Sequence, residues 1–487
     1  MAKILGSLKP QPLWDIFESI CKVPHPSKHE EKLIKFILEF AKEHQIEAFQ
    51  EKSGNVIMRK PAAPGMEKLK GVILQSHLDM VPQKNSDSSH DFYKDPIVPR
   101  IEGRFVKATG TTLGADNGIG IAASLALMAS KNINHGPLEC LMTFDEESGL
   151  TGALKLESGS LKGKILLNLD SEAHGELFIG CAGGQNTTGR IRYKVESAGS
   201  NMKAFHLAVK GLKGGHSGVD IHLGRGNAIK LITRVLWNAA RDFGIRITEL
   251  KGGTLRNAIP REAFALVAVP AEMQKGFSEF VSRFADTAAL ELAAVDPGVS
   301  ITMEPAPMPD NVIVKVSQKK ILNALYSCPN GVFRMSSEME GLVETSNNLA
   351  MVKAEKGEFQ IATLQRSSVD SQKDDIAFMI ASVLDQAGAK YDSSSSYPGW
   401  KPDLNSEILD LMKKVFKKMY GTEPGVAAIH AGLECGLFKS VYPHWDMISF
   451  GPSIHSPHSP DESVEIESVG KFWDLLIETL KNIPKKS

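Results

Sequence analysis

Short apolar runs alternate with helical segments in the first third of the chain, and this pattern constrains the fold more than any other feature. Continuous apolar runs begin at Val72, Leu141 and Ile165, and an alanine-rich segment with helical character covers residues 119–130. Strands of a parallel sheet give such runs because helices bury both of their faces. The pattern therefore predicts an α/β layer with a mainly parallel sheet.

The middle of the chain has a different pattern. Residues 205–303 predict the element order βαββαβ, which suits a ferredoxin-like split sandwich, and residues 319–387 predict a looser second copy with faint first strands. The polar run at 392–399, Asp-Ser-Ser-Ser-Ser-Tyr-Pro-Gly, is rich in turn formers and predicts a linker. Helix and strand patterns typical of an α/β layer return after it.

The chain length requires more than one core. Its 487 residues exceed the roughly 250–300 at which single cores stop growing. We expect an α/β domain interrupted by a long inserted α+β domain, the lid, made of two ferredoxin-like halves. The predicted ranges are 1–186 for the first part of the α/β domain, 187–396 for the lid and 397–487 for the second part.

Charge and cysteine content narrow the class of partner. The chain has 56 basic and 57 acidic residues, so no overall field attracts nucleic acid or an anionic membrane, and we expect neither as a partner. The five cysteines are scattered, which argues against a disulfide framework and a thiolate zinc site. No stretch approaches the roughly 20 apolar residues of a membrane span. A cytoplasmic location is expected.

The strongest chemical signal is the acidic run Asp-Glu-Glu at 145–147, which follows an apolar strand. Adjacent carboxylates repel one another unless cations compensate them. Neighbouring side chains face different ways, so Glu147 is free to bind a metal while Glu146 moves a proton. The alternative is a solvated acidic turn.

Other candidates also follow predicted strands, where open α/β sheets place ligand sites. In an extended chain the side chains of His77 and Asp79, two residues apart, lie on the same side, so the carboxylate is able to support the imidazole. The alternative is an ordinary polar pair. Asp116 lies in a glycine-rich loop and Asp170 ends a strand, and each also suits a helix cap. Such nitrogen and oxygen donors suit zinc, manganese or cobalt.

These residues resemble, in order and context, the zinc-dependent metallopeptidase family of aminoacylases, carnosinases, tripeptidases and glutamate carboxypeptidases. The resemblance covers essentially the whole chain. The segments at 113–118, 430–436 and 458–462 look most like the branch that cleaves aminoacyl-histidine and other dipeptides: Leu-Gly-Ala-Asp-Asn-Gly, His-Ala-Gly-Leu-Glu-Cys-Gly and His-Ser-Pro-Asp-Glu.

The resemblance implies two divalent metal ions, with zinc as the expected metal and manganese or cobalt as alternatives. It implies that Asp79 steadies a metal-binding histidine and that Glu146 takes a proton from the water between the metals. His458 is preferred to His455 because only His458 directly precedes Ser-Pro-Asp-Glu. The implied metal ligands are His77, Glu147, Asp170 and His458, with Asp116 bridging both ions.

The same resemblance implies substrate-binding residues in the lid. His216, in a Gly-Gly-His-Ser-Gly loop, and Asn257, in Asn-Ala-Ile-Pro, are the implied donors to the oxyanion and the substrate. Pro270 stands where relatives often carry a carboxylate-binding arginine, so Arg366 is the expected replacement, with a surface ion pair as the alternative. Glu434 is expected to meet the substrate amino group or to begin a helix.

The expected function is metal-dependent hydrolysis of dipeptides with broad tolerance, including those ending in histidine such as β-alanyl-histidine. Two alternatives stay open, a deacylase of N-acyl amino acids and a catalytically silent metal-binding protein. The two lid halves suggest a monomer whose second half mimics a partner or a homodimer formed through the lid, and we expect the homodimer.

Overall fold

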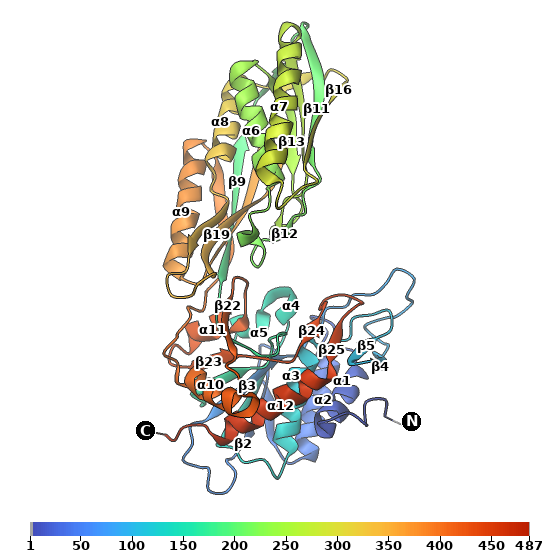
Figure 1. Ribbon diagram of the computed structural model, residues 1–487, viewed down its shortest axis with the longest axis vertical. Coiled ribbons are helices and arrows are strands. Elements are labelled where there is room, and N and C mark those ends of the chain that lie inside the picture. The colour runs from blue at the N-terminus through green and yellow to red at the C-terminus, as the bar shows by residue number, and fades with distance from the viewer. Residues whose placement is uncertain (1–2, 487) are drawn as a thin grey trace. The chain divides into compact units, whose positions relative to one another are not determined.

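The computed structural model describes residues 3–486, and internal contacts divide them into two compact units (Figure 1). The first unit runs to Gly180 and includes Pro402–Ala428 and the chain from Leu433 onwards. The second unit comprises Cys181–Lys401 and Ile429–Gly432. The chain thus leaves the first unit at 180 and returns at 402, beside the predicted changes at 186 and 397. The predicted α/β fold with a second, inserted α+β region is confirmed.

An eight-stranded sheet of order β1-β2-β6-β3-β7-β23-β8-β22 forms the centre of the first unit. Its middle is parallel, through the pairs β3–β6, β3–β7 and β7–β23, whereas β1–β2, β2–β6 and β8–β23 are antiparallel. The sheet is therefore mixed rather than mainly parallel. Its strands are β1 (Glu47–Gln50), β2 (Val56–Lys60), β3 (Val72–His77), β6 (Leu138–Thr143), β7 (Ile165–Asn168), β8 (Glu176–Cys181), β22 (Gly425–Ile429) and β23 (Asp446–Ser449).

Helices and a smaller sheet complete this unit. Among the helices, α3 packs against α1 and β3, and α10 packs against α12 and β23. The small sheet has the order β24-β25-β5-β4. The elements are α1 (Gln11–Cys21), α2 (Glu31–Glu43), α3 (Ala115–Ala129), α4 (Glu146–Gly149), α5 (Thr151–Leu154), α10 (Glu407–Tyr420), α11 (Glu434–Val441), α12 (Ile466–Lys481), β4 (Pro99–Glu102), β5 (Phe105–Ala108), β24 (Ile454–His455) and β25 (Ser463–Glu465).

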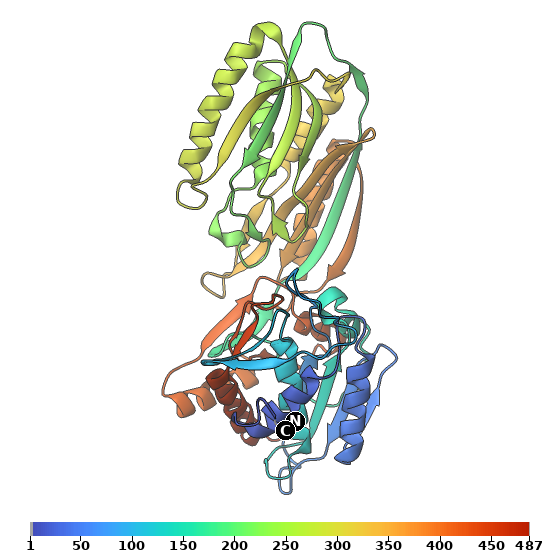
Figure 2. The same cartoon turned by 90° about the vertical axis from the view of Figure 1, so that its right-hand side faces the viewer.

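The second unit is built on one long sheet of order β16-β11-β15-β13-β19-β20-β9-β21, with β18 also paired to β19. Figures 1 and 2 show its helices α6, α7, α8 and α9 along one face of this sheet. The elements are β9 (Gly183–Arg192), β11 (Met202–Lys210), α6 (Ala228–Asp242), β13 (Arg246–Gly252), β15 (Ala263–Pro270), α7 (Gln274–Leu292), β16 (Ser300–Ala306), α8 (Lys315–Ser327), β18 (Gly331–Met335), β19 (Val343–Glu355), β20 (Glu358–Ser367), α9 (Asp370–Gln386) and β21 (Lys390–Tyr397).

Strand order shows the two ferredoxin-like halves directly. The first half, β11-α6-β13-β15-α7-β16, has its strands in the spatial order 4-1-3-2. The second half has the same order when β9 is taken as its first strand, followed by α8, β19, β20, α9 and β21. This strand precedes the entire first half in the sequence. The faint start of the second copy has a structural reason, because its first strand is β9 and lies upstream of residues 319–387.

The linker predicted at 392–399 is wrong. Lys390–Tyr397 forms β21, which pairs antiparallel with β9 at the edge of the long sheet. Its serines are exposed, as suits an edge strand, and its backbone is held by the register with β9 rather than by apolar side chains. The polar composition suggested a linker, but pairing with β9 makes this segment a strand.

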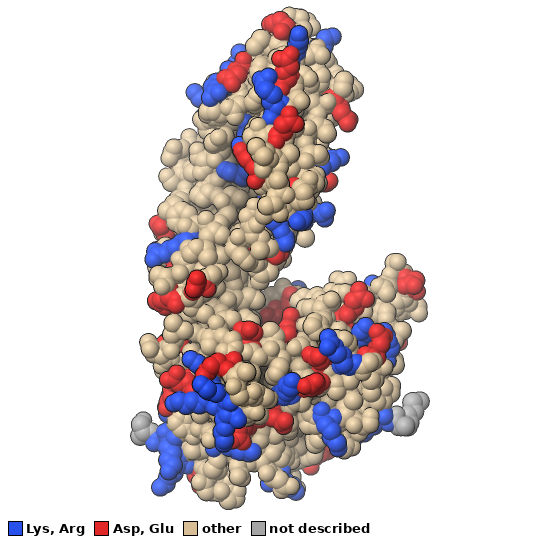
Figure 3. Space-filling view, in the orientation of Figure 1, with Lys and Arg blue, Asp and Glu red and all other residues tan. Residues whose placement is uncertain are grey.

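No helix among the described residues is long and apolar enough to cross a membrane. Figure 3 shows acidic and basic side chains interspersed over the visible face of each unit, as the near-zero net charge suggests.

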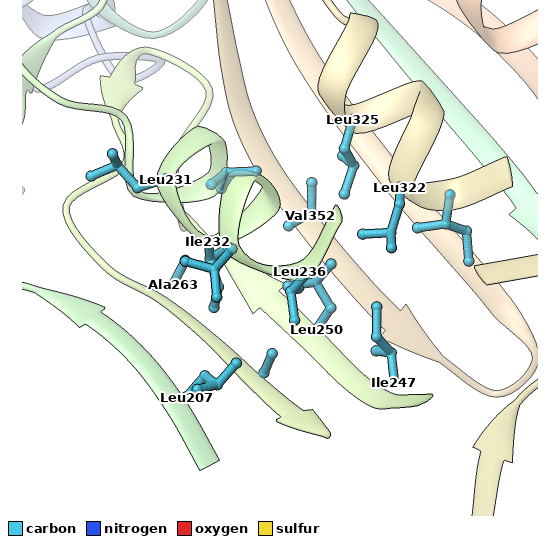
Figure 4. Packing of buried hydrophobic residues seen from close by; sticks show 14 of the residues in the cluster. Leu207, Leu231, Ile232, Leu236, Ile247, Leu250, Ala263, Leu322, Leu325 and Val352 are labelled. Carbon is cyan, nitrogen blue, oxygen red and sulfur yellow. The ribbon is translucent and has the colours of Figure 1, made fainter. Parts of the chain in front are cut away.

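The second unit owes its stability to apolar helix faces on the sheet. Leu231, Ile232 and Leu236 of α6 lie over side chains of β11, β13 and β15 (Figure 4). Leu322 and Leu325 of α8 join the same core. Burying each such side chain contributes about 1.5–3 kcal/mol.

Candidate functional site

The predicted metal ligands and the predicted general base of the first unit lie at one edge of its sheet. His77 is the last residue of β3, Glu146 begins the helix α4 that follows β6, and Asp170 lies two residues beyond β7. These strands are parallel, so their carboxyl ends share an edge. Asp116, at the start of α3, and His458 approach the same edge.

The centre of this cluster is Asp116, whose two carboxylate oxygens face different histidines. Its Oδ1 lies 3.0 Å from Nε2 of His77, and its Oδ2 lies 3.1 Å from Nε2 of His458. Asp170 Oδ1 is 3.2 Å from His77 Nε2, and Glu147 Oε1 is 2.9 Å from His458 Nε2. Donor atoms within 4.8 Å of one another therefore form two groups that share Asp116.

Glu146 and the two histidines of the last loop lie differently around these groups. Glu146 forms a third group with His77 and Glu147, so its carboxylate lies at the same centre. His458 adopts a left-handed backbone conformation with φ of 57°, which is uncommon for a residue other than glycine. His455, the other histidine of that loop, instead packs against the ring of Phe105.

Asp79 holds more than the histidine. Its carboxylate lies 3.4 Å from Nδ1 of His77 and also accepts hydrogen bonds from the backbone N–H groups of Glu146 at 2.9 Å and Glu147 at 3.1 Å. Nδ1 of His77 also hydrogen-bonds to the backbone carbonyl of Asp79 at 3.0 Å, so Asp79 holds the imidazole through its backbone as well as its side chain. Its buried carboxylate fixes the turn that carries the two glutamates. The turn includes Asp145, which is also left-handed at φ 53°.

The electrostatics reflect crowded carboxylates. Burial and the nearby charges of Asp170, Glu434 and Glu147 raise the pKa of Glu146 well above its ordinary value. Burial alone would lower the pKa of His77, but the surrounding carboxylates raise it well above 6.5. Hydrogen bonds to Asp116 and Glu147 raise the pKa of His458 to about 11. The cluster therefore carries a concentration of negative charge that cations would relieve.

Sequence reasoning missed Glu462. This buried side chain accepts hydrogen bonds from four successive backbone N–H groups, those of Leu113, Gly114, Ala115 and Asp116, at 2.7–3.4 Å. It fixes the loop that presents Asp116. The only signal in the sequence was its place at the end of the His-Ser-Pro-Asp-Glu segment.

Glu434 lies beneath the strand ends in a buried polar network. Its Oε2 accepts hydrogen bonds from Gln75 at 2.6 Å and from the Thr143 hydroxyl at 2.7 Å, and Asn168 donates to Gln75. The side chain of Glu434 is fully buried, and its Oε1 has no hydrogen-bond partner among the described residues. The expected contact with a substrate amino group stays a prediction.

In the second unit, His216 and Arg366 come together. Nδ1 of His216 accepts hydrogen bonds from the backbone N–H groups of Gly218 and Val219, each at 3.2 Å. Burial and Arg366 lower the pKa of His216. Because Nδ1 accepts, a neutral ring carries its single proton on Nε2. Nε2 of His216 lies 3.5 Å from Nη2 of Arg366, so two groups able to donate to substrate oxygens are neighbours.

Asn257 lies on the same ribbon as His216. The two-residue strands β12 (Gly215–His216) and β14 (Ala258–Ile259) pair, and the Asn257 carbonyl accepts the N–H of Ser217 at 2.7 Å. The Asn257 side chain is exposed. Pro270 ends β15 opposite Met202.

The profile of peptidase family M20/M25/M40 matches residues 73–482. The chain is 47% identical over 482 residues to the cytosol non-specific dipeptidase of Escherichia coli K12, with 99% of each chain covered. The crystal structure of the aminoacylhistidine dipeptidase of Vibrio alginolyticus matches with a TM-score of 0.94 at 49% identity, again over 99% of both chains. Aminopeptidase PepT of Bacillus cereus shares the fold at 16% identity and a TM-score of 0.57, over 98% of this chain and 99% of its own. The family predicted from the motifs is confirmed: the chain belongs to peptidase family M20/M25/M40.

Proposed function

We propose that this protein is a metal-dependent dipeptidase whose first unit holds two divalent cations. The observation that carries the proposal is Asp116, which directs one carboxylate oxygen to each of two donor groups. The names of the Escherichia coli and Vibrio alginolyticus relatives, both dipeptidases, support the choice of substrate.

The donor set fits borderline divalent metals. One ion would be held by His77, Asp116 and Asp170, and the other by Asp116, Glu147 and His458. Imidazole and carboxylate donors without thiolate suit zinc, which we propose, with manganese and cobalt as alternatives. When bound, such ions polarise a peptide carbonyl and make water more acidic.

The protein's own groups would then carry the proton and the charge. Glu146, whose carboxylate lies beside His77 and Glu147, takes a proton from the attacking water and passes it to the leaving amine. His216 donates its Nε2–H to the oxygen that becomes negative, and Arg366 grips the substrate carboxylate, with Asn257 as a further contact. Asp79 keeps His77 and the turn of Glu146 in place.

Location and assembly complete the proposal. A cytoplasmic location is supported by the name of the Escherichia coli relative, a cytosol dipeptidase. A homodimer formed through the second unit is supported by the exposed apolar side chains of Phe333 and Met335 on the short strand β18. Sedimentation of the purified protein measures this assembly directly.

The test is hydrolysis of a dipeptide panel and the N-acetylated versions after metal removal and return of zinc, manganese or cobalt. Glu146→Gln is expected to lower kcat by about 10²–10⁴-fold, the usual contribution of a general base. Glu157→Gln, a change of an exposed glutamate, is the matched control. Cleavage of acetylated substrates alone would make the protein a deacylase, and no cleavage with any metal would make it a silent binding protein.

A further inference from the structure

Arg366 lies on a single rung that crosses four strands of the second unit. In the register of the sheet, Ser346 of β19 is opposite Arg366 of β20, Arg366 is opposite Gly184 of β9, and Gly184 is opposite Tyr397 of β21. Residues opposite one another in a sheet present their side chains on the same face. Tyr397 and Arg366 are therefore separated by one strand that carries no side chain at this rung.

The missing side chain lets the tyrosine reach the arginine. A Cβ atom on Gly184 would lie 2.6–2.7 Å from the ring and hydroxyl of Tyr397, so the ring lies directly over this glycine. The hydroxyl of Tyr397 accepts a hydrogen bond from Nη1 of Arg366 at 3.2 Å. Any larger residue at 184 would block this contact.

A β-bulge places Tyr397 on the rung. Ser394 pairs with Asn186 and Tyr397 with Gly184, so β21 uses three residues where β9 uses two. Such an extra residue re-aims the side chains that follow, and bulges are frequent beside functional sites. The Tyr397 carbonyl also accepts a hydrogen bond from the ammonium of the buried Lys373 at 2.7 Å. This hydrogen bond anchors the strand after the bulge.

The hydrogen bond decides which edge of the guanidinium stays open. Nη1 is occupied by Tyr397, whereas among the described residues Nε is buried without a hydrogen-bond partner and Nη2 faces only the Nε2–H of His216. Nε and Nη2 form the side-on fork of arginine, which matches the two oxygens of a carboxylate. We propose that Tyr397 is a positioning residue that turns this fork of Arg366 toward the carboxylate of the substrate. The inference rests on the proposed function.

The test is a double-mutant cycle with L-alanyl-L-alanine as substrate. Tyr397→Phe keeps the ring over Gly184 and removes only the hydroxyl that accepts from Arg366, so KM is expected to rise about tenfold with kcat little changed. In an Arg366→Lys background the same change is expected to have no further effect, because lysine has no fork to orient. Tyr391→Phe, on the same strand but with an exposed ring, is the matched control and should leave both parameters unchanged.

The outcomes separate the two levels of the argument. A wild-type protein that cleaves no dipeptide overturns the proposed function and this inference with it. If the wild type is active and Tyr397→Phe has the same KM, the inference alone is overturned. The same holds if the KM increase in the double variant equals the product of the increases in the two single variants. Melting temperatures of Tyr397→Phe and Tyr391→Phe within a few degrees of wild type exclude a folding defect as the cause.

Discussion

Replacing Asp79 with asparagine tests how the metal centre is held. The carboxylate accepts two backbone N–H groups, from Glu146 and Glu147, and faces the Nδ1 of His77. Asparagine keeps one acceptor oxygen and turns an NH₂ group toward the other N–H. The change removes one charge-assisted hydrogen bond, worth about 1.5–3 kcal/mol.

That loss is expected to weaken metal binding by about 10–100-fold, as is usual when a residue that positions a metal ligand is replaced. The measurement is competition for zinc with a chromophoric chelator, which needs no catalytic activity. Asp79→Asn protein that binds zinc within about twofold of wild type would refute the reasoning, since a factor of two is only about 0.4 kcal/mol.

Asp446→Asn is the matched control. Asp446 also accepts a backbone N–H, from Ile408 at 2.9 Å, and the hydroxyl of Ser406. It lies at the amino end of β23, paired with the first residue of β7, and therefore at the opposite edge of the sheet from the metal centre. We expect this variant to lose stability by a similar amount and to keep the zinc affinity of wild type.

Two further changes test buried polar groups of the first unit. Burial raises the pKa of Glu30 from 4.5 to about 7, so the carboxyl ionises at lower pH in the unfolded chain than in the folded protein, and its contribution to stability is lost as pH rises from 4.5 to 7. Glu30→Gln should remove up to about 3 kcal/mol of this pH dependence of the unfolding free energy measured in urea, and an unchanged pH profile would contradict the prediction. Gln75→Leu takes a donor from the buried carboxylate of Glu434 and should lower the unfolding free energy by about 1–3 kcal/mol, so an unaltered melting temperature would count against this network.

Local patterns in the sequence singled out most residues of the candidate metal centre. Strand ends are recognisable because apolar runs stop abruptly at polar residues, and parallel strands bring such ends together. Strand ends therefore singled out His77, Glu147 and Asp170, which lie far apart in the chain, whereas the resemblance to the peptidase family supplied their predicted roles as metal ligands. The structure places all three at one edge, with Asp116 and His458 among them.

Long-range pairings were beyond the sequence. Glu462 fixes the Asp116 loop across 346 residues, and nothing in its own neighbourhood indicates which backbone it will meet. The same limit explains β21, whose serines have no apolar pattern because the strand is held by its neighbour β9. Residues whose role depends on a distant backbone leave no periodic trace.

The interleaved order of the second unit affects how the chain folds during synthesis. Strand β9 ends at Arg192, but its two neighbours in the sheet, β20 and β21, extend to Tyr397. At about 5–20 residues per second, the ribosome needs on the order of 10–40 s to supply the roughly 200 residues between them. The first ferredoxin-like half is complete within that interval, whereas β9 must wait with both edges unpaired. A nascent chain stalled before residue 358 would therefore present a folded domain joined to a strand that is open to aggregation or to a chaperone.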